Sequence, residues 1–389
     1  MKNALKYLAM AALVFFAASC DKDPNGDKPN TGNALVISVE NGVIQNNGTD
    51  VAKITVTYEN EDVTAESEFF DGTQPISIPN GEFKSTEVKT FEIWASYGAN
   101  TSAKIKINVV PFAVPAPAVD EEPTLTDFYP GLLFMQFTGS ECPNCPLMNK
   151  KVDPLFDPEN KQFSGKQYWE NVVRVFSHTY NINSDPASGT KVFGEKFGIN
   201  GWPTAILDFD YTHHITNLVT SEYLSKMFDE ALAAKEGKCP GIAVHSELKD
   251  GVLIANASVK AAVDKDYLIG AILLEDGING VQAGGGKTVF DSCVRLVDGG
   301  ATKTDIYGHE LGHISKGKSM NHVFVWNLKE EWENNKYSSW EGNGFVEKNL
   351  RVAYYVLSCK NNGHSKEYTF ETAIAATANA NQSFIYAAE

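Results

Sequence analysis

The chain has 389 residues, with 49 acidic and 33 basic side chains and a formal net charge of −16 at pH 7. Phosphate backbones and anionic headgroups repel such a chain, so its composition argues against nucleic acid or an anionic lipid surface as a partner. Hydrophobic residues make up 43% of the sequence, and the length is enough for two or more domains, each with its own core.

Residues 1–19 have the pattern of a secretory signal peptide, with lysines first, then an apolar run, then small residues before Cys20. The apolar run is too short to cross a bilayer as a helix. Cys20 stands where a bacterial lipoprotein carries its acylated cysteine, and we predict lipidation there, with ordinary secretion and cleavage nearby as the alternative. The polar residues 20–32 then predict a flexible tether between the lipid and the folded chain.

Residues 33–112 alternate apolar and polar positions in short runs that Gly, Asn and Asp separate. These runs cover residues 35–39, 52–58, 90–97 and 103–109. A period of two predicts strands with one buried face, so we expect a small antiparallel β-sandwich. It resembles bacterial immunoglobulin-like modules, which usually act as spacers. The following residues 113–123 are rich in proline and predict a stiff linker.

Cys142 and Cys145 form a C-x-x-C pair after the apolar run 131–137 and before a polar helical stretch. Two thiols at this spacing, at a strand-to-helix junction, form a reversible disulfide, and the helix N-terminus favours the thiolate of the first cysteine. Glu141 precedes the pair, and its carboxylate opposes a thiolate at Cys142. The pattern predicts redox chemistry, with an inert structural disulfide as the alternative.

Residues 197–208 predict a helix end, a tight turn, a proline and then a buried strand. Trp202 precedes Pro203, and an aromatic residue before proline is compatible with a cis peptide bond. The C-x-x-C pair followed by G-x-P-T resembles the thioredoxin superfamily, in which a cis-proline loop lies against the dithiol and accepts the substrate backbone. The resemblance implies an α/β thioredoxin-like domain over residues 124–238, with a second central strand at 172–176 and a closing helix at 221–235.

The same resemblance implies roles for individual residues. Cys142 would attack a substrate disulfide, and Cys145 would resolve the mixed disulfide. Pro203 would present the substrate strand, with Trp202 and Thr204 beside it. The chain departs from the family pattern before the first cysteine. Many thioredoxins have a buried aspartate that assists proton transfer at the position of Gln136, and a tryptophan at the position of Glu141.

Residues 239–389 again alternate in short runs and predict a second β-sandwich, of the fibronectin-like type. The runs cover residues 242–247, 252–259, 267–274, 289–297, 322–328, 350–357 and 368–373. If these strands follow the usual up-and-down order, Cys239 and Cys359 lie at the same pole of the sandwich. We therefore predict a structural disulfide between them, and a buried free thiol at Cys293.

Residues 309–313 read His-Glu-Leu-Gly-His and match the zinc-peptidase pattern H-E-x-x-H. On a helix this spacing would place both histidines on one face for zinc, with Glu310 as general base. Gly308 and Gly312 lie in a strand-rich region and disfavour such a helix. We predict a solvated loop without a metal, and a zinc metallopeptidase is a minor alternative.

The order of the regions behind the lipoprotein signal is similar to that in the Gram-negative lipoprotein family called outer membrane protein twenty-eight. This order is an immunoglobulin-like module, then a dithiol domain, then a sandwich. The resemblance is most specific at residues 137–146 and 201–204. It implies a location at the outer membrane through the lipid anchor, on the periplasmic or the surface face; an adhesin or receptor role has been proposed for the family. We predict thiol-disulfide exchange with exported proteins or a redox partner, without a cofactor. The alternative is a surface binding or adhesion protein that keeps the thioredoxin fold without turnover.

Overall fold

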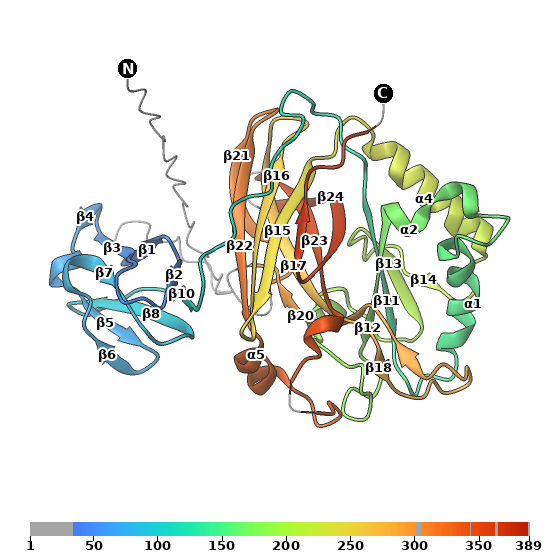
Figure 1. The fold of residues 1–389 in the computed structure, drawn as a ribbon, viewed down its shortest axis with the longest axis horizontal. Coiled ribbons are helices and arrows are strands. Elements are labelled where there is room, and N and C mark those ends of the chain that lie inside the picture. The colour runs from blue at the N-terminus through green and yellow to red at the C-terminus, as the bar shows by residue number, and fades with distance from the viewer. Residues whose placement is uncertain (1–33, 301–304, 343, 362–364, 388–389) are drawn as a thin grey trace, which may run out of the picture. The chain divides into compact units, whose positions relative to one another are not determined.

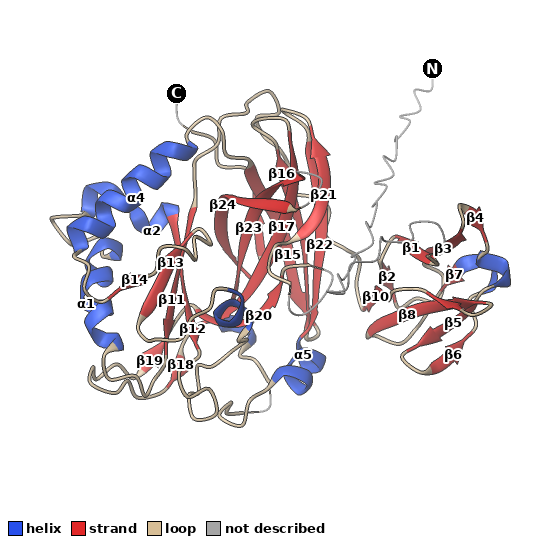
Figure 2. Cartoon of the chain, turned by 180° about the vertical axis from the view of Figure 1, so that it is seen from behind, coloured by secondary structure: helices blue, strands red, loops and turns tan. Residues whose placement is uncertain are grey.

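A computed structural model describes residues 34–300, 305–342, 344–361 and 365–387 (Figure 1). The predicted signal peptide, the lipidation site Cys20 and the tether lie outside these ranges. The chain divides into two compact units, Met1–Ala113 and Val114–Glu389, and is a multi-sheet, mostly β protein (Figure 2). Among the helices that the structure describes, none is long and apolar enough to cross a membrane.

The first unit consists of two sheets around one core. The four-stranded sheet contains β1 (Val36–Glu40), β3 (Ala52–Tyr58), β4 (Glu61–Asp62) and β7 (Glu82–Phe83). The six-stranded sheet contains β2 (Val43–Gln45), β10 (Ile105–Val110), β8 (Thr90–Tyr97), β5 (Glu68–Asp71), β6 (Gln74–Ile76) and β9 (Asn100–Thr101). Short 3-10 helices η1 (Thr64–Glu66) and η2 (Pro79–Gly81) join the strands.

Alternation along the strands explains this packing. In β3, Ile54 and Val56 are buried, and their side chains meet Ile93 of β8 and Ile107 of β10 across the two sheets. The strand pairs are antiparallel, as the sequence predicts, except that β2 runs parallel to β10.

The second unit is built on a nine-stranded sheet. Its strands are β14 (Ile215–Thr216), β13 (Thr204–Leu207), β11 (Leu132–Thr138), β12 (Val172–His178), β20 (Cys293–Asp298), β17 (Lys265–Glu275), β23 (Leu350–Asn361) and β24 (Lys366–Thr377) in spatial order, and β21 (His309–Ile314), which pairs with β17. A four-stranded sheet contains β22 (Ser319–Asn327), β16 (Val252–Lys260), β15 (Gly241–Lys249) and β25 (Ala380–Gln382). β18 (Ile278–Asn279) and β19 (Val289–Phe290) form a separate hairpin.

The helices that the structure describes in this unit are α1 (Cys145–Phe156), α2 (Tyr168–Asn171), α3 (Val192–Lys196), α4 (Ser221–Lys235) and α5 (Leu328–Asn335), with 3-10 turns η3 (Ser164–Lys166) and η4 (Glu347–Asn349). α1, α2 and α4 lie beside β11, β13 and β14, away from the four-stranded sheet (Figures 1 and 2). Their side chains Met148, Leu224 and Phe228 share a core with Leu132 and Phe134 of β11.

Two central strands contribute to a core on each face. All of β11 is buried, and Leu133 and Phe137 face away from the helices into a second core. Leu268 and Ile272 of β17 belong to that second core. The intervening positions of β17, among them Ile269, face a third core shared with the four-stranded sheet. A strand that is buried on both faces needs apolar side chains at successive positions. This burial explains why the 131–137 run, which contains β11, is almost continuously apolar.

The structure does not separate the regions 124–238 and 239–389, which the sequence analysis treats as two domains. β12 pairs in parallel with β20 through Phe176 and Cys293, so both regions contribute to one sheet within one compact unit. The physical reason is the second core, because α1 and α4 cover only one face of β11. Strands of the C-terminal region, together with α3, cover the other face.

The predicted linker is also part of this unit from residue 114 onward. The carbonyl of Pro115 accepts a hydrogen bond from Asn256 at 2.9 Å, and Asp120 pairs with the buried Lys260 at 2.8 Å. The segment therefore lies along the four-stranded sheet instead of spanning free space.

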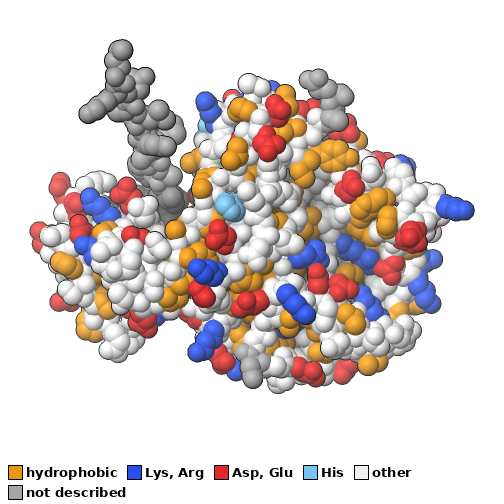
Figure 3. All heavy atoms as spheres, in the orientation of Figure 1, with side chains coloured by type: hydrophobic (Ala, Val, Ile, Leu, Met, Phe, Trp, Pro, Cys, Tyr) orange, Lys and Arg blue, Asp and Glu red, His pale blue; other side chains and the backbone are white. Residues whose placement is uncertain are grey.

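Charged side chains of both signs are interspersed on the face that Figure 3 shows.

Candidate functional site

The C-x-x-C pair lies where β11 ends and α1 begins, as predicted. Cys142 and Cys145 form a disulfide, with their Cα atoms 5.5 Å apart. The turn is closed by backbone bonds from Cys142 N to Gly139 O at 3.1 Å and from Cys145 N to Cys142 O at 3.4 Å. Pro146 stands in the first turn of α1, where its missing N–H costs no helical hydrogen bond.

Neither cysteine is accessible in this oxidised state. Cys142 is 2% exposed and Cys145 is 1% exposed, although Glu141, Pro143 and Asn144 between and beside them are exposed. A nucleophile that attacks either sulfur needs a local opening. Thioredoxin-like chemistry therefore has to include a step that uncovers the pair.

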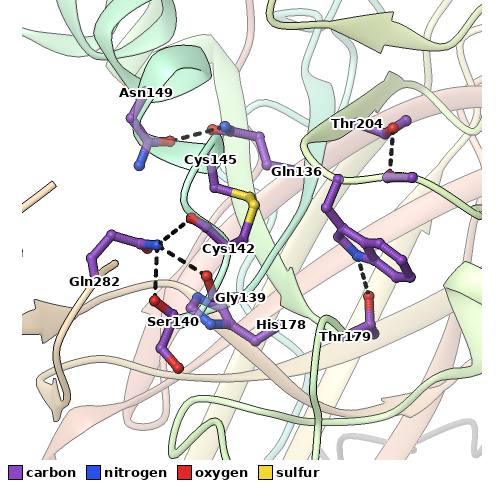
Figure 4. Close-up of a disulfide and its surroundings, with 12 residues drawn as sticks. Gln136, Gly139, Ser140, Cys142, Cys145, Asn149, His178, Thr179, Thr204 and Gln282 are labelled. Atoms are coloured by element: carbon purple, nitrogen blue, oxygen red, sulfur yellow. Dashed lines mark hydrogen bonds between the residues drawn. A yellow bond between two sulfur atoms is a disulfide. The ribbon is translucent and has the colours of Figure 1, made fainter. Parts of the chain in front are cut away.

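The cis-proline segment lies next to the dithiol. The Trp202–Pro203 bond is cis, and β13 begins directly after it. Thr204 pairs with Phe137 in the antiparallel register of β13 and β11, which brings the segment to the end of β11 where the C-x-x-C turn starts (Figure 4). The Thr204 hydroxyl donates to Gly201 O at 2.8 Å and holds the turn.

Trp202 is held by its neighbours. Its indole N–H donates to the Thr179 hydroxyl at 3.1 Å, and its ring meets Tyr180 edge to face at 5.5 Å. The indole is half-buried, so part of it remains available at the surface beside the cis-proline segment.

The neutral amide of Gln136 occupies the position of the aspartate that many thioredoxins have. Gln136 is buried, and its amide nitrogen donates to Asn149 at 3.2 Å (Figure 4). Its amide oxygen accepts from Arg174 Nε at 2.6 Å. Arg174 also contacts Asp153 at 2.8 Å. Burial lowers the pKa of Arg174, and Asp153 partly offsets this effect. No carboxylate takes the place of Gln136.

A buried histidine–aspartate pair supports the other side of the turn. Asp185 accepts from the backbone N–H of Ser140 at 2.6 Å and lies 2.9 Å from His178 Nδ1. The second carboxylate oxygen accepts from Ala187 N at 2.9 Å. Burial alone would raise the pKa of Asp185, but the hydrogen bond and charge of His178 together with the two backbone N–H groups lower it. The carboxylate thus anchors the start of the C-x-x-C turn.

Gln282 is the site residue that the sequence analysis missed. Its side-chain amide donates to the carbonyls of Gly139, Ser140 and Cys142 at 3.0, 3.1 and 3.1 Å (Figure 4). The neighbouring Ala283 N–H donates to Ser140 O at 2.7 Å. Gln282 is separated from Cys142 by 140 positions, and one glutamine in a polar turn has no local pattern that would reveal this contact.

The H-E-x-x-H segment forms strand β21, not the predicted loop and not a helix. His309 bonds Asp298 at 2.6 Å, and His313, which is exposed, bonds Asp266 at 3.1 Å. The two histidines thus contact different carboxylates, and Glu310 pairs with Lys366. Among the described residues, no group of three or more His, Cys, Asp or Glu side chains could hold a metal ion.

The predicted Cys239–Cys359 disulfide is not formed, and both cysteines are free. Cys239 is buried in a small core and its thiol donates to Phe128 O at 3.5 Å. Cys359 lies on β23 opposite Tyr368, in the nine-stranded sheet. The prediction failed because Cys239 lies in the small core before β15, whereas Cys359 packs on the second core, on the face of the nine-stranded sheet that is turned away from the four-stranded sheet. Cys293 is a buried free cysteine, as predicted.

The three free thiols should react in a fixed order with iodoacetamide at pH 7. We expect Cys359, which is half-buried, to be labelled first. Burial raises the pKa of Cys239 to about 11 and that of Cys293 further, so little thiolate is present at either site. Peptide mass spectrometry of the native protein over time measures the order. Labelling of Cys293 before Cys359 would contradict it.

Comparisons with known proteins found similarity to solved structures only. The chain matches no family model, and no curated protein matches it. A solved structure, HBP35 of Porphyromonas gingivalis, is similar with a TM-score of 0.47 and 14% sequence identity, over 67% of this chain and 79% of that chain. The function of this chain is therefore argued from the residues of its own site.

Proposed function

We propose that this protein exchanges thiols and disulfides with exported proteins through a thioredoxin-like region of the second unit. The observation that carries the proposal is the Cys142–Cys145 disulfide at the start of α1, beside the cis Trp202–Pro203 bond at the start of β13. The strand order also supports the proposal. In the order β14-β13-β11-β12, β11 is parallel to β12 and antiparallel to β13, and α4 follows at the end of the region.

The exchange proceeds in two steps. The Cys142 thiolate attacks one sulfur of a substrate disulfide, a mixed disulfide forms, and the other substrate sulfur leaves as a thiolate that takes up a proton. Cys145, after losing its proton, attacks Cys142 Sγ and releases the second substrate sulfur. Two electrons pass from the protein dithiol to the substrate, and the Cys142–Cys145 disulfide is restored. The reverse sequence oxidises a substrate dithiol.

The substrate would bind along the cis-proline segment. Pro203 is buried, so it fixes the backbone there, and the half-buried Trp202 offers an apolar surface beside the disulfide. Thr204 closes this turn through its bond to Gly201. A substrate strand placed against this segment brings its own sulfur close to Cys142.

The proposed location is the outer membrane, through a lipid on Cys20. This rests on the signal pattern of residues 1–19 and on the polar tether 20–32. A lipid anchor holds the folded units outside the cytoplasm, where disulfides persist in substrate proteins.

A non-catalytic binding or adhesion protein is the second candidate. The observation that favours it is the burial of both cysteines, which are 2% and 1% exposed. A disulfide that is never uncovered would only stabilise the turn. The two candidates differ in whether the pair turns over.

Insulin reduction distinguishes the two candidates. With dithiothreitol as the electron source, we expect the wild-type protein to accelerate insulin reduction, and Cys142→Ser and Cys145→Ser to fall to the rate without protein. Cys359→Ser is the matched control, because Cys359 is a free cysteine away from the pair, and it should keep the wild-type rate. If the wild-type protein is fully reduced and still does not raise the rate of insulin reduction above the background, the exchange function is wrong and the binding role remains.

A further inference from the structure

Residues 280–287 form a loop that lies on the C-x-x-C turn. The loop connects β18 and β19, which pair only with each other within the described part of the chain. Two backbone bonds close it, from Gly280 N to Thr288 O at 3.0 Å and from Gln282 N to Lys287 O at 2.9 Å. The loop is thus held on a very short hairpin instead of on a main sheet, which makes it a separable piece of structure.

Polar contacts attach this loop to the turn. Gln282 is 4% exposed, and its amide nitrogen reaches the three carbonyls of Gly139, Ser140 and Cys142. Ala283 N–H adds a fourth contact, to Ser140 O. The backbone of the turn therefore relies on a segment far away in the sequence for its hydrogen bonds.

Glycines let the loop backbone come directly against the turn. A Cβ on Gly284 would lie 2.8 Å from Pro143 O, and a Cβ on Gly285 would lie 2.7 Å from Pro146 Cγ. Side chains at these positions would push the loop away. Gly286 has nothing within 4 Å of its Cβ position, so the close approach is confined to the two glycines that face the turn.

We propose that residues 280–287 form a cover over the C-x-x-C turn, which has to move before a thiol can reach the Cys142–Cys145 disulfide and which therefore sets the rate of exchange. The contacts put the loop on the backbone that carries both cysteines, which are buried although the residues beside them are exposed. Gln282 is the residue that holds it closed. This inference rests on the proposed function and adds a control of access to the same site.

The test measures reduction of the protein disulfide by dithiothreitol. The two thiols of dithiothreitol become its cyclic disulfide, two electrons pass to the Cys142–Cys145 bond, and the two protons released end on the new thiols. We expect Gln282→Ala and Gly284→Ala each to raise the second-order rate constant by about tenfold. The first variant loses the hydrogen bonds that hold the cover, and the second pushes the loop away from Pro143. Maleimide trapping and mass spectrometry count the free thiols over time.

Gly286→Ala is the matched control. Gly284 and Gly286 both have left-handed φ values, +73° and +68°, so an alanine strains the loop equally at either position. Only the Gly284 variant pushes against the turn, and Gly286→Ala should stay within about twofold of wild type. Hydrogen exchange of the amides at 139–145 should accelerate in Gln282→Ala and not in Gly286→Ala.

The outcomes separate the cover from the function. Wild-type reduction rates in Gln282→Ala refute the cover, whether or not Gly284→Ala folds. If Gln282→Ala is reduced faster than wild type, but neither the wild-type protein nor any variant reduces insulin, the cover is supported and the exchange function is refuted. Equal acceleration in Gly284→Ala and Gly286→Ala shows that loop strain alone is responsible and also overturns the proposal.

Discussion

We expect Asp185→Ala to lower the free energy of unfolding of the second unit by about 3 kcal/mol at pH 7, the upper end for leaving buried hydrogen-bond donors without a partner. Asp185 is fully buried, and its two oxygens accept from Ser140, Ala187 and His178. The alanine variant leaves these donors buried without an acceptor. Urea denaturation measures the loss.

The same carboxylate makes stability depend on pH. Burial alone would raise its pKa, but the bonds from His178, Ser140 and Ala187 hold the folded-state pKa below the usual value for an aspartate. Its contribution is therefore fully present above the unfolded-state pKa of about 3.9 and is lost as the pH falls through the folded-state pKa. The difference in unfolding free energy between wild type and Asp185→Ala should be constant from pH 7 to about pH 5 and should shrink below about pH 4.

Asp157→Ala is the control for this experiment. Asp157 is exposed and accepts from Glu159 N at 2.9 Å, so it has a comparable backbone bond without burial. Its replacement should change the unfolding free energy by about 1 kcal/mol or less. Equal losses in the two variants would show that the buried pair has no special role.

Gly189→Ala should destabilise the second unit by about 3 kcal/mol, at the upper end for overpacking. A Cβ at Gly189 would lie 1.7 Å from Val294 O and 2.9 Å from Arg295 Cα, both backbone atoms of β20 that cannot rotate away. The loop before α3 would have to leave β20. That would break the bond from Thr190 N to Arg295 O, which is 3.1 Å long.

The control for Gly189 is Gly165→Ala. Gly165 has nothing within 4 Å of its Cβ position and no left-handed φ, so alanine fits there and should change the unfolding free energy by no more than about 0.5 kcal/mol. Thermal and urea unfolding of the three proteins compare the effects. A Gly189→Ala protein as stable as Gly165→Ala would mean that the contact with β20 is not formed.

Features with local signals could be predicted from the sequence. The predicted helix 221–235 is α4 (Ser221–Lys235), because Thr220 caps it by accepting from Tyr223 N at 3.2 Å and apolar residues recur along one face. The apolar run 131–137 forms β11, and the dithiol and the cis bond at Pro203 lie where the pattern places them. Each of these depends on residues close together in the chain.

Features that depend on distant pairing could not be predicted. The parallel contact between Phe176 and Cys293 joins strands whose own patterns fit two separate domains equally well. The three bonds of Gln282 depend on where a hairpin loop ends in space. The error at His309–Ile314 has the same origin, because pairing with β17 made a strand of a segment whose glycines suggested a loop.

The sheet that both regions share also limits where the chain can be cut for expression. A fragment that ends at residue 238 lacks β20, β17 and β23, so one edge of β12 has no partner and Leu133 and Phe137 lose part of the apolar cover that they have in the second core. Such a product presents an unpaired strand edge and an apolar face, which promote aggregation. The dithiol region is therefore expected to fold in soluble form only when the C-terminal strands are expressed with it.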